Sequence, residues 1–140
     1  MDTTVKEIAW SDKLNTDVTS IDLQHKRMAY RLENLRLFER MTPIPDCIFE
    51  EYLTIIDEIE THFSYEEAIM ANIHCDNFDA HCMSHQNILN KLYELRDEVI
   101  LTKDFSRIHE AISLVDKMIA GHLSHEDSNI KKVLHRSLPN

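Results

Sequence analysis

Glycine is almost absent from this chain of 140 residues, which contains a single one, Gly121, and only three prolines. Phosphate-binding loops and dinucleotide-binding turns are built from several closely spaced glycines, so one glycine excludes both. A turn-rich β fold is also disfavoured, because tight turns depend on glycine and proline. The composition therefore favours helices joined by short connections.

Signals for membranes, secretion and nucleic acids are missing as well. The chain has no run of about 18 apolar residues, and its start, "MDTTVKEIAW", has neither region of a signal peptide. Its net charge of −10 disfavours a phosphate backbone as a partner. We therefore expect a cytoplasmic protein with no membrane insertion and no nucleic-acid partner. The three cysteines form no CxxC pair and fit free thiols in a reducing compartment: Cys47, Cys75 and Cys82.

Apolar residues recur at steps of three and four, which places them on one face of a helix. Four segments show this period, and proline or polar residues separate them. Alternating steps of three and four are typical of helices that pack nearly parallel in a bundle. The segments cover about residues 20–39, 46–71, 77–101 and 104–122.

The predicted fold is all-α: an up-down-up-down four-helix bundle with an N-terminal arm and a short C-terminal tail. Short connections force neighbouring helices to run antiparallel. We expect one domain over residues 1–140, with the arm at 1–18, the bundle at about 20–127 and the tail at 128–140. No large exposed apolar face is evident from the sequence, so we expect a monomer.

Five of the nine histidines fall on the apolar stripes rather than on the polar faces. In an up-down course, the first and third helices begin at the end of the bundle where the second and fourth finish. The five histidines lie near these four helix ends, so their imidazoles should meet at one level of the core. They are His25, His62, His81, His85 and His122.

Two carboxylates are expected to join the histidines. Glu66 follows His62 by four residues and so lies on the same helical face. Asp127 follows His122 by five, a step that requires the chain to loosen after Gly121 before the carboxylate can turn inward. A glycine at a helix end can equally be an ordinary C-cap, and the sequence leaves both explanations open.

These seven side chains are the pattern of a dinuclear metal site. A single buried histidine is more often a hydrogen-bonded core residue, but ionised carboxylates are tolerated in a core mainly when they are paired or bind a metal. Seven donor side chains are too many for one ion, whereas two ions bridged by Glu66 and Asp127 would each receive an ordinary number of ligands. Imidazole and carboxylate without thiolate suit iron, manganese or zinc.

Motifs spread along most of the chain carry a family resemblance. The sequence has Trp10 in the arm, "IDLQHK" at 21–26, "HFSYEE" at 62–67 followed by Met70, "HCMSH" at 81–85 and "HLSHED" at 122–127. With these motifs the chain resembles the hemerythrin family, and in particular its bacterial members. Two departures from the family pattern are Cys75–Asp76 before the third helix and Met118 in place of a common aromatic residue.

The resemblance implies an oxo- or hydroxo-bridged pair of iron ions that binds O₂ reversibly. By position, His81, His85 and His122 correspond to the ligands of one iron, and His25 and His62 to those of the other, which keeps an open coordination position. Glu66 and Asp127 correspond to the bridging carboxylates. Residues within about one turn of these ligands are expected to line an O₂ pocket: Met28, Ile59, Phe63, Ile88, Ile119 and Leu123.

Three functions are compatible with such a centre. The first is a non-enzymatic carrier, store or scavenger of O₂ in a bacterial cytoplasm, and it is the one we favour. The second is an O₂- or redox-sensing module read by an unknown protein partner. The third is an enzyme acting on peroxide, nitric oxide or ferrous iron, which the lack of an additional acid or base on the apolar stripes disfavours.

Overall fold

The computed structural model describes residues 19–73, 76–102 and 105–122. These residues form four helices, and the described part of the chain contains no strand. Each helix begins and ends within one residue of its predicted bounds, so the helical periodicity of the sequence is confirmed. The helices are α1 (Thr19–Glu39), α2 (Cys47–Asn72), α3 (Phe78–Thr102) and α4 (Phe105–Gly121).

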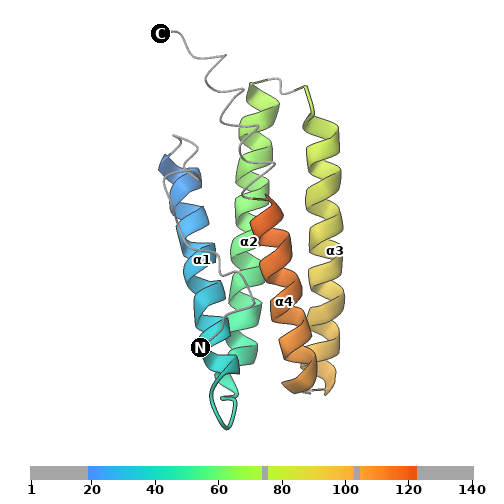
Figure 1. The fold of residues 1–140 in the computed structure, drawn as a ribbon. Coiled ribbons are helices and arrows are strands. Elements are labelled where there is room, and N and C mark those ends of the chain that lie inside the picture. Colours follow the sequence, from blue (N-terminus) through green and yellow to red (C-terminus); the bar gives the residue numbers. More distant parts are fainter. Residues whose placement is uncertain (1–18, 74–75, 103–104, 123–140) are drawn as a thin grey trace.

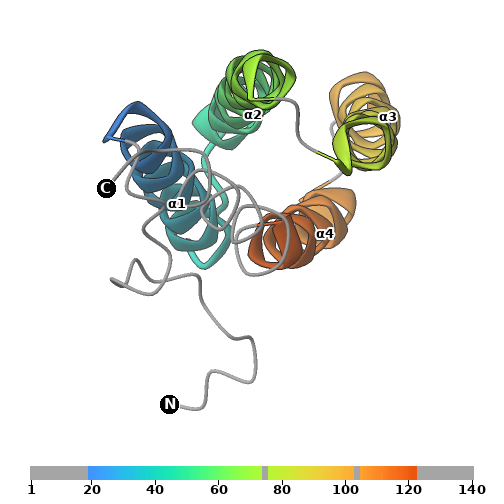
Figure 2. The same cartoon turned by 90° about the horizontal axis from the view of Figure 1, so that it is seen from above.

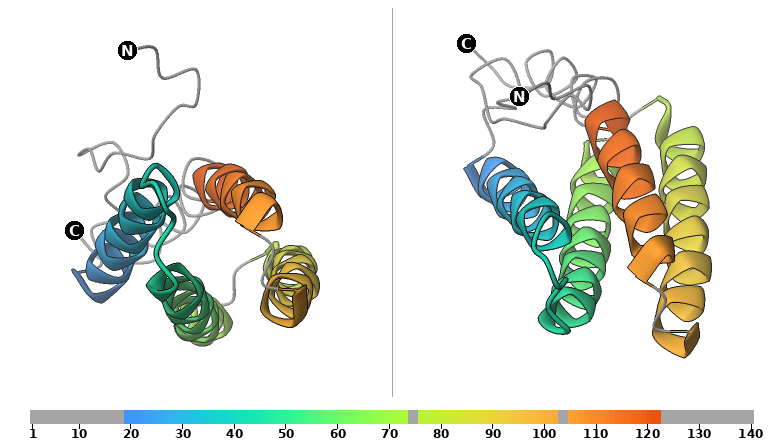
Figure 3. Two further views of the ribbon diagram at one scale, coloured as in Figure 1. Left: turned by 90° about the horizontal axis from the view of Figure 1, so that it is seen from below. Right: turned by 60° about the horizontal axis from the view of Figure 1, so that its bottom comes forward.

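The helices form the predicted antiparallel bundle (Figure 1). Each helix packs on the two that flank it, in the cyclic order α1, α2, α3, α4. The view along the bundle in Figure 2 shows the four helices around a common centre, and Figure 3 shows the short connection from α1 to α2 at the opposite end. The first turns of α1 and α3 and the last turns of α2 and α4 therefore share one end of the bundle. The predicted arm and tail lie outside the described residues.

The apolar stripes of the four helices make one continuous core. Its fully buried members include Leu32, Tyr52, Ile55, Leu92 and Ile108. Burial of a side chain of this size contributes about 1.5–3 kcal/mol, so this core supplies the main driving force for the fold. Near the end of α2 the structure buries Met70 and leaves Ile69 only half-buried.

A buried ion pair crosses the core between α1 and α4. Arg36 and Asp116 bond to each other, and both side chains are almost completely removed from solvent. The hydrophobic period predicts apolar packing at this level and gives no sign of an internal charge pair. Two charges buried together are tolerated only when they compensate each other, so each depends on the other for its place in the core.

Gly121 requires no special backbone or close approach. Its φ is not positive, so it does not form the left-handed C-cap that the sequence allowed. A Cβ built on it would meet no heavy atom within 4 Å. The helix widens to a π-type turn at His122, directly after this glycine. The loosening predicted on the way to Asp127, and Asp127 itself, lie outside the described residues.

Replacing Gly121 with alanine is expected to stabilise the protein. Alanine loses less conformational freedom than glycine when a helix forms, and the added methyl group has open space. We expect Gly121→Ala to raise the free energy of unfolding of the metal-free protein by about 0.4–1 kcal/mol, measured by equilibrium urea denaturation. A loss of stability would show instead that the end of α4 depends on glycine.

Candidate metal centre

Six of the seven predicted ligand residues meet at one end of the bundle. The N-terminal halves of α1 and α3, the C-terminal half of α2 and the residue that directly follows α4 contribute to the cluster. Every one of the six side chains is buried, with at most 6% of the residue exposed. They are His25, His62, Glu66, His81, His85 and His122. Asp127 lies outside the described residues, and the role of all seven as ligands stays a prediction.

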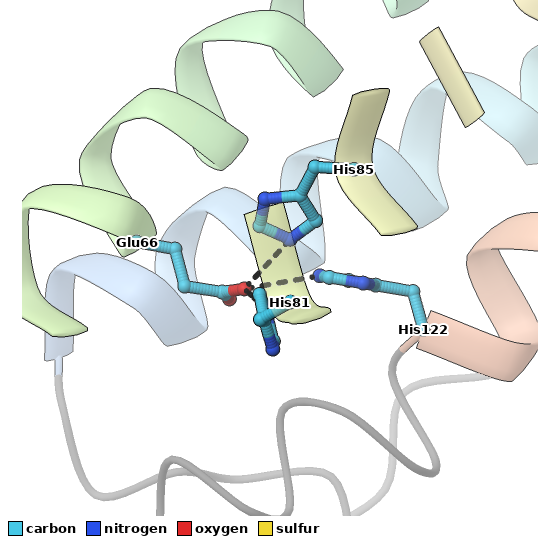
Figure 4. Close-up of side chains that lie close together, drawn as sticks. All are labelled: Glu66, His81, His85 and His122. Carbon is cyan, nitrogen blue, oxygen red and sulfur yellow. Dashed lines mark hydrogen bonds and ion pairs between the residues drawn. The ribbon is translucent and has the colours of Figure 1, made fainter. Parts of the chain in front are cut away.

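Glu66 lies at the centre of the cluster, where three imidazoles approach one of its carboxylate oxygens (Figure 4). Glu66 Oε1 is 2.6 Å from the Nε2 atom of His81. The same oxygen is 3.1 Å from Nε2 of His85 and 3.3 Å from Nε2 of His122. The second oxygen, Oε2, lies 3.1 Å from Nε2 of His62. The two oxygens of one carboxylate therefore serve two different sets of imidazoles.

The second set is completed by His25, whose Nε2 lies 3.2 Å from Nε2 of His62. The donor atoms thus form two overlapping groups, and within each group they lie within 4.8 Å of one another. We call them the three-histidine group (Glu66, His81, His85 and His122) and the two-histidine group (His25, His62 and Glu66). Glu66 belongs to both, as a bridging carboxylate between two ions must.

The protons of two imidazoles can be placed from their outer contacts. His62 Nδ1 lies 2.9 Å from Gln24 Oε1, and His85 Nδ1 lies 2.7 Å from Glu67 Oε2. Both oxygens are acceptors, so each Nδ1 carries the hydrogen and donates it outward. In a neutral imidazole the other nitrogen then holds a lone pair. For His62 and His85 this lone pair points into the cluster.

This donor set fits metal ions. Lone pairs of His62 and His85 face oxygens of Glu66, which are also acceptors, and a metal cation between the partners would compensate this contact in a dry core. Coordination bonds of about 2.1 Å at right angles place neighbouring ligand atoms about 3 Å apart. The separations around Glu66, 2.6–3.3 Å, are close to that value. The absence of sulfur from both groups agrees with iron, manganese or zinc.

Glu66 is held in its ionised form by its surroundings. Burial by itself raises the pKa of this carboxyl, because a charge is poorly solvated in the core. The surrounding imidazoles, that of His122 having the largest effect, outweigh burial and keep the pKa of Glu66 well below its usual range. The group is therefore a carboxylate, as a bridging ligand requires.

The aromatic ring of Phe63 packs against two of the clustered histidines, His85 and His122. Phe63 stacks face to face on His85, with ring centroids 3.8 Å apart and planes inclined by 1°. Its centroid is also 4.9 Å from that of His122. Both side chains are buried, so the packing fixes the orientation of two imidazoles that approach the same oxygen of Glu66.

A small apolar cavity borders the cluster at His122. Its volume is about 10 Å³, roughly the room of one water-sized sphere. Five of the six residues predicted to line an O₂ pocket line this cavity, and Met118 joins them. The lining consists of Met28, Ile59, Phe63, Ile88, Met118, Ile119 and His122. Leu123 lies outside the described residues, and the use of the cavity for O₂ stays a prediction.

Sequence reasoning missed Gln24 and Glu67, which contact the outer nitrogens of His62 and His85. Each comes from the preceding helix and reaches the histidine of the next one: Gln24 from α1 to α2, and Glu67 from α2 to α3. The only available signal was that each stands directly beside a predicted ligand, in "LQHK" and "SYEE". Adjacent residues on a helix point in different directions, so neither shares the apolar stripe.

The remaining chemical groups of the described residues give no second site. Burial and the nearby Glu67 raise the pKa of the Cys82 thiol, which disfavours the reactive thiolate. Cys47 is an exposed free thiol, and His109 is half exposed beside Glu39, as expected for a histidine off the stripes. No helix in the described ranges is both long and apolar enough to cross a membrane.

Fold and cluster together define a four-helix bundle with a candidate dinuclear histidine–carboxylate centre. Over most of its length the chain is similar to proteins named bacteriohemerythrin. It is 25% identical over 134 residues to that of Pseudomonas aeruginosa strain LESB58, covering 94% of this chain and 84% of the relative. It is 24% identical over 131 residues to that of Pseudomonas paraeruginosa strain DSM 24068, with the same coverage.

A third relative, the bacteriohemerythrin of Stenotrophomonas maltophilia strain R551-3, is 24% identical over 123 residues, which cover 86% of this chain and 76% of that protein. No family model matches the sequence. The similarities support a hemerythrin-like protein.

Proposed function

We propose that this chain is a bacterial hemerythrin: a non-haem di-iron protein that binds O₂ reversibly as a carrier, store or scavenger. The observation that carries the proposal is the division of Glu66 between two groups of imidazoles, one at each carboxylate oxygen. The similarity to bacteriohemerythrins supports iron as the metal. Two bound iron ions would supply the coordination position and the electrons for O₂ binding.

The chain's own residues have separate tasks in this proposal. The three-histidine group would hold one ion, and His25 and His62 would hold the other. Glu66 would bridge the two, and Asp127 is proposed as the second bridge. Gln24 and Glu67 keep the outer nitrogens of His62 and His85 protonated, so that the inner nitrogens are free to donate.

The apolar cavity supports reversible binding. Its lining offers no hydrogen bond to water apart from the imidazole of His122, so a small apolar molecule is favoured there over solvent. Exclusion of water and of exogenous protons is what a reversible adduct needs, because proton delivery promotes irreversible reaction. Met118, Phe63 and Ile88 are the residues we assign to this barrier.

We also propose that residues 1–140 act as a single domain and as a monomer in the cytoplasm of a bacterium. No protein partner is proposed. A sensing role and an enzymatic role at the same centre are the competing functions, and the experiment that follows separates them from O₂ carriage.

The test is a visible spectrum of the purified chain, reduced without oxygen and then exposed to air, with iron counted per chain. Reversible O₂ binding predicts two irons per chain and a colourless reduced form that colours in air and bleaches under inert gas. Prompt, irreversible oxidation would retain the di-iron centre but replace carriage with sensing or catalysis. Absence of bound iron after reconstitution would overturn the assignment of the site.

A further inference from the structure

One histidine in each half of the cluster donates its outer N–H to a side chain, and these two side chains differ in charge. His85, in the three-histidine group, donates its outer N–H to a carboxylate, that of Glu67, over 2.7 Å. His62, in the two-histidine group, donates its outer N–H to an amide oxygen, that of Gln24, over 2.9 Å. One supporting group carries a full negative charge and the other is neutral.

This difference changes the donor strength of the imidazoles. A carboxylate behind a histidine draws the Nδ1 proton towards itself, which raises the electron density and the basicity of Nε2. An amide oxygen fixes the ring and its tautomer but contributes only a dipole. The number of imidazoles acts in the same direction, since the group supported by Glu67 has three and the group supported by Gln24 has two.

We propose that Glu67 and Gln24 are positioning residues that make the two ion positions unequal. The three-histidine group binds its ion first and more tightly, and the two-histidine group binds second and more weakly. The inference rests on the proposed function, in which the cluster holds two ions.

Both supporting residues lie at the rim of the cluster, which makes them suitable for substitution. The Glu67 side chain is 34% exposed. Gln24 is half-buried and borders a solvent-accessible groove of about 250 Å³ between α1 and α2. Changes of charge at these two positions therefore need no reorganisation of the apolar core.

Cobaltous ion is the probe, titrated into the metal-free full-length chain and followed by calorimetry and visible absorption. The wild-type chain should bind two ions in two resolved steps. Glu67→Gln keeps the size of the side chain and removes its charge. The affinity for the first cobalt ion should therefore fall by about 10–100-fold, while the affinity for the second changes little. Glu94→Gln is the matched control, because this exposed residue on α3 loses the same charge about 13 Å farther along the helix from His85.

Gln24→Glu is the reciprocal variant. It places a carboxylate behind His62, so the affinity for the second cobalt ion should rise. The difference in affinity between the first and the second ion should therefore become smaller. In the double variant Gln24→Glu/Glu67→Gln the two effects should add, so the difference in affinity between the first and the second ion should be smaller than in either single variant. Since the Gln24 variant acts on the opposite half of the cluster, it tests the inference independently if Glu67→Gln fails to fold, which circular dichroism would report.

The outcomes separate this inference from the proposed function. Fewer than two cobalt ions bound by the wild-type chain would overturn the dinuclear site and the inference with it. If the wild-type chain binds two ions, the dinuclear site stands. The inference alone is then overturned if Glu67→Gln binds the first ion with the same affinity as Glu94→Gln, and Gln24→Glu binds the second ion with the same affinity as the wild-type chain.

Discussion

Replacing Glu66 with glutamine is expected to abolish the proposed dinuclear site while leaving the bundle folded. The side chain is fully buried, and its two oxygens face different groups of imidazoles. Glutamine has the same shape but no charge and only one acceptor oxygen, so it cannot serve both groups. The bound metal should fall from two ions to at most one per chain, and the colour that develops in air should be lost.

The expected loss in affinity exceeds the 10–100-fold that is typical when a residue behind a ligand is replaced, because Glu66 itself is the shared donor. Metal content by atomic emission and the helical signal in circular dichroism are the two measurements. Glu50→Gln is a suitable control, since this exposed glutamate on α2 lies about 24 Å along the helix from Glu66. Retention of two ions per chain by Glu66→Gln would contradict the bridging role.

Breaking the buried ion pair of α1 and α4 is expected to cause the largest loss of stability. In Asp116→Ala the guanidinium of Arg36 loses its carboxylate and stays in a site with little access to water. Removing one partner of such a pair costs about 3–5 kcal/mol, a large part of the roughly 5–15 kcal/mol that holds a domain of ordinary stability. Equilibrium urea denaturation of the metal-free protein measures the change.

The double replacement Arg36→Met/Asp116→Leu distinguishes the loss of a contact from the cost of an uncompensated charge. With both charges removed and the volume filled by apolar atoms, most of the lost stability should return. Glu98→Ala, which breaks the exposed pair between Glu98 and Arg107, is the control and should cost less than about 1 kcal/mol. A single replacement of Asp116 that costs no more than this control would show that water reaches Arg36.

The bundle could be predicted from the sequence because one property, the period of the apolar residues, determines both helix positions and buried faces. The histidines were found by the same means: His25 and His85 fall on the stripes among isoleucines and leucines, and the stripes of all four helices end at one level. Short connections then left little choice of topology. The chemistry of the core was thus readable from the pattern that builds the core.

Contacts between the sides of neighbouring helices could not be predicted in this way. Gln24 and Glu67 lie off the stripes, and their positions against His62 and His85 depend on how two helices are rotated about their axes, which periodicity does not give. Arg36 and Asp116 were missed for the opposite reason, since charged residues are normally assigned to the surface. Asp127 and Leu123 remain predictions, because they lie outside the described residues.

The confinement of the cluster to one end of the bundle has a consequence for how the protein is made. The rest of the interior is an apolar core that needs no metal, so the newly synthesised chain can reach its helical topology before any ion arrives. At the cluster end, the lone pairs of His62 and His85 face the carboxylate of Glu66, and these groups would repel one another until cations bind between them. Metal binding would therefore be a late, local step that stabilises one end of a bundle that has already folded. The amide hydrogens at that end should exchange more slowly once the ions are bound.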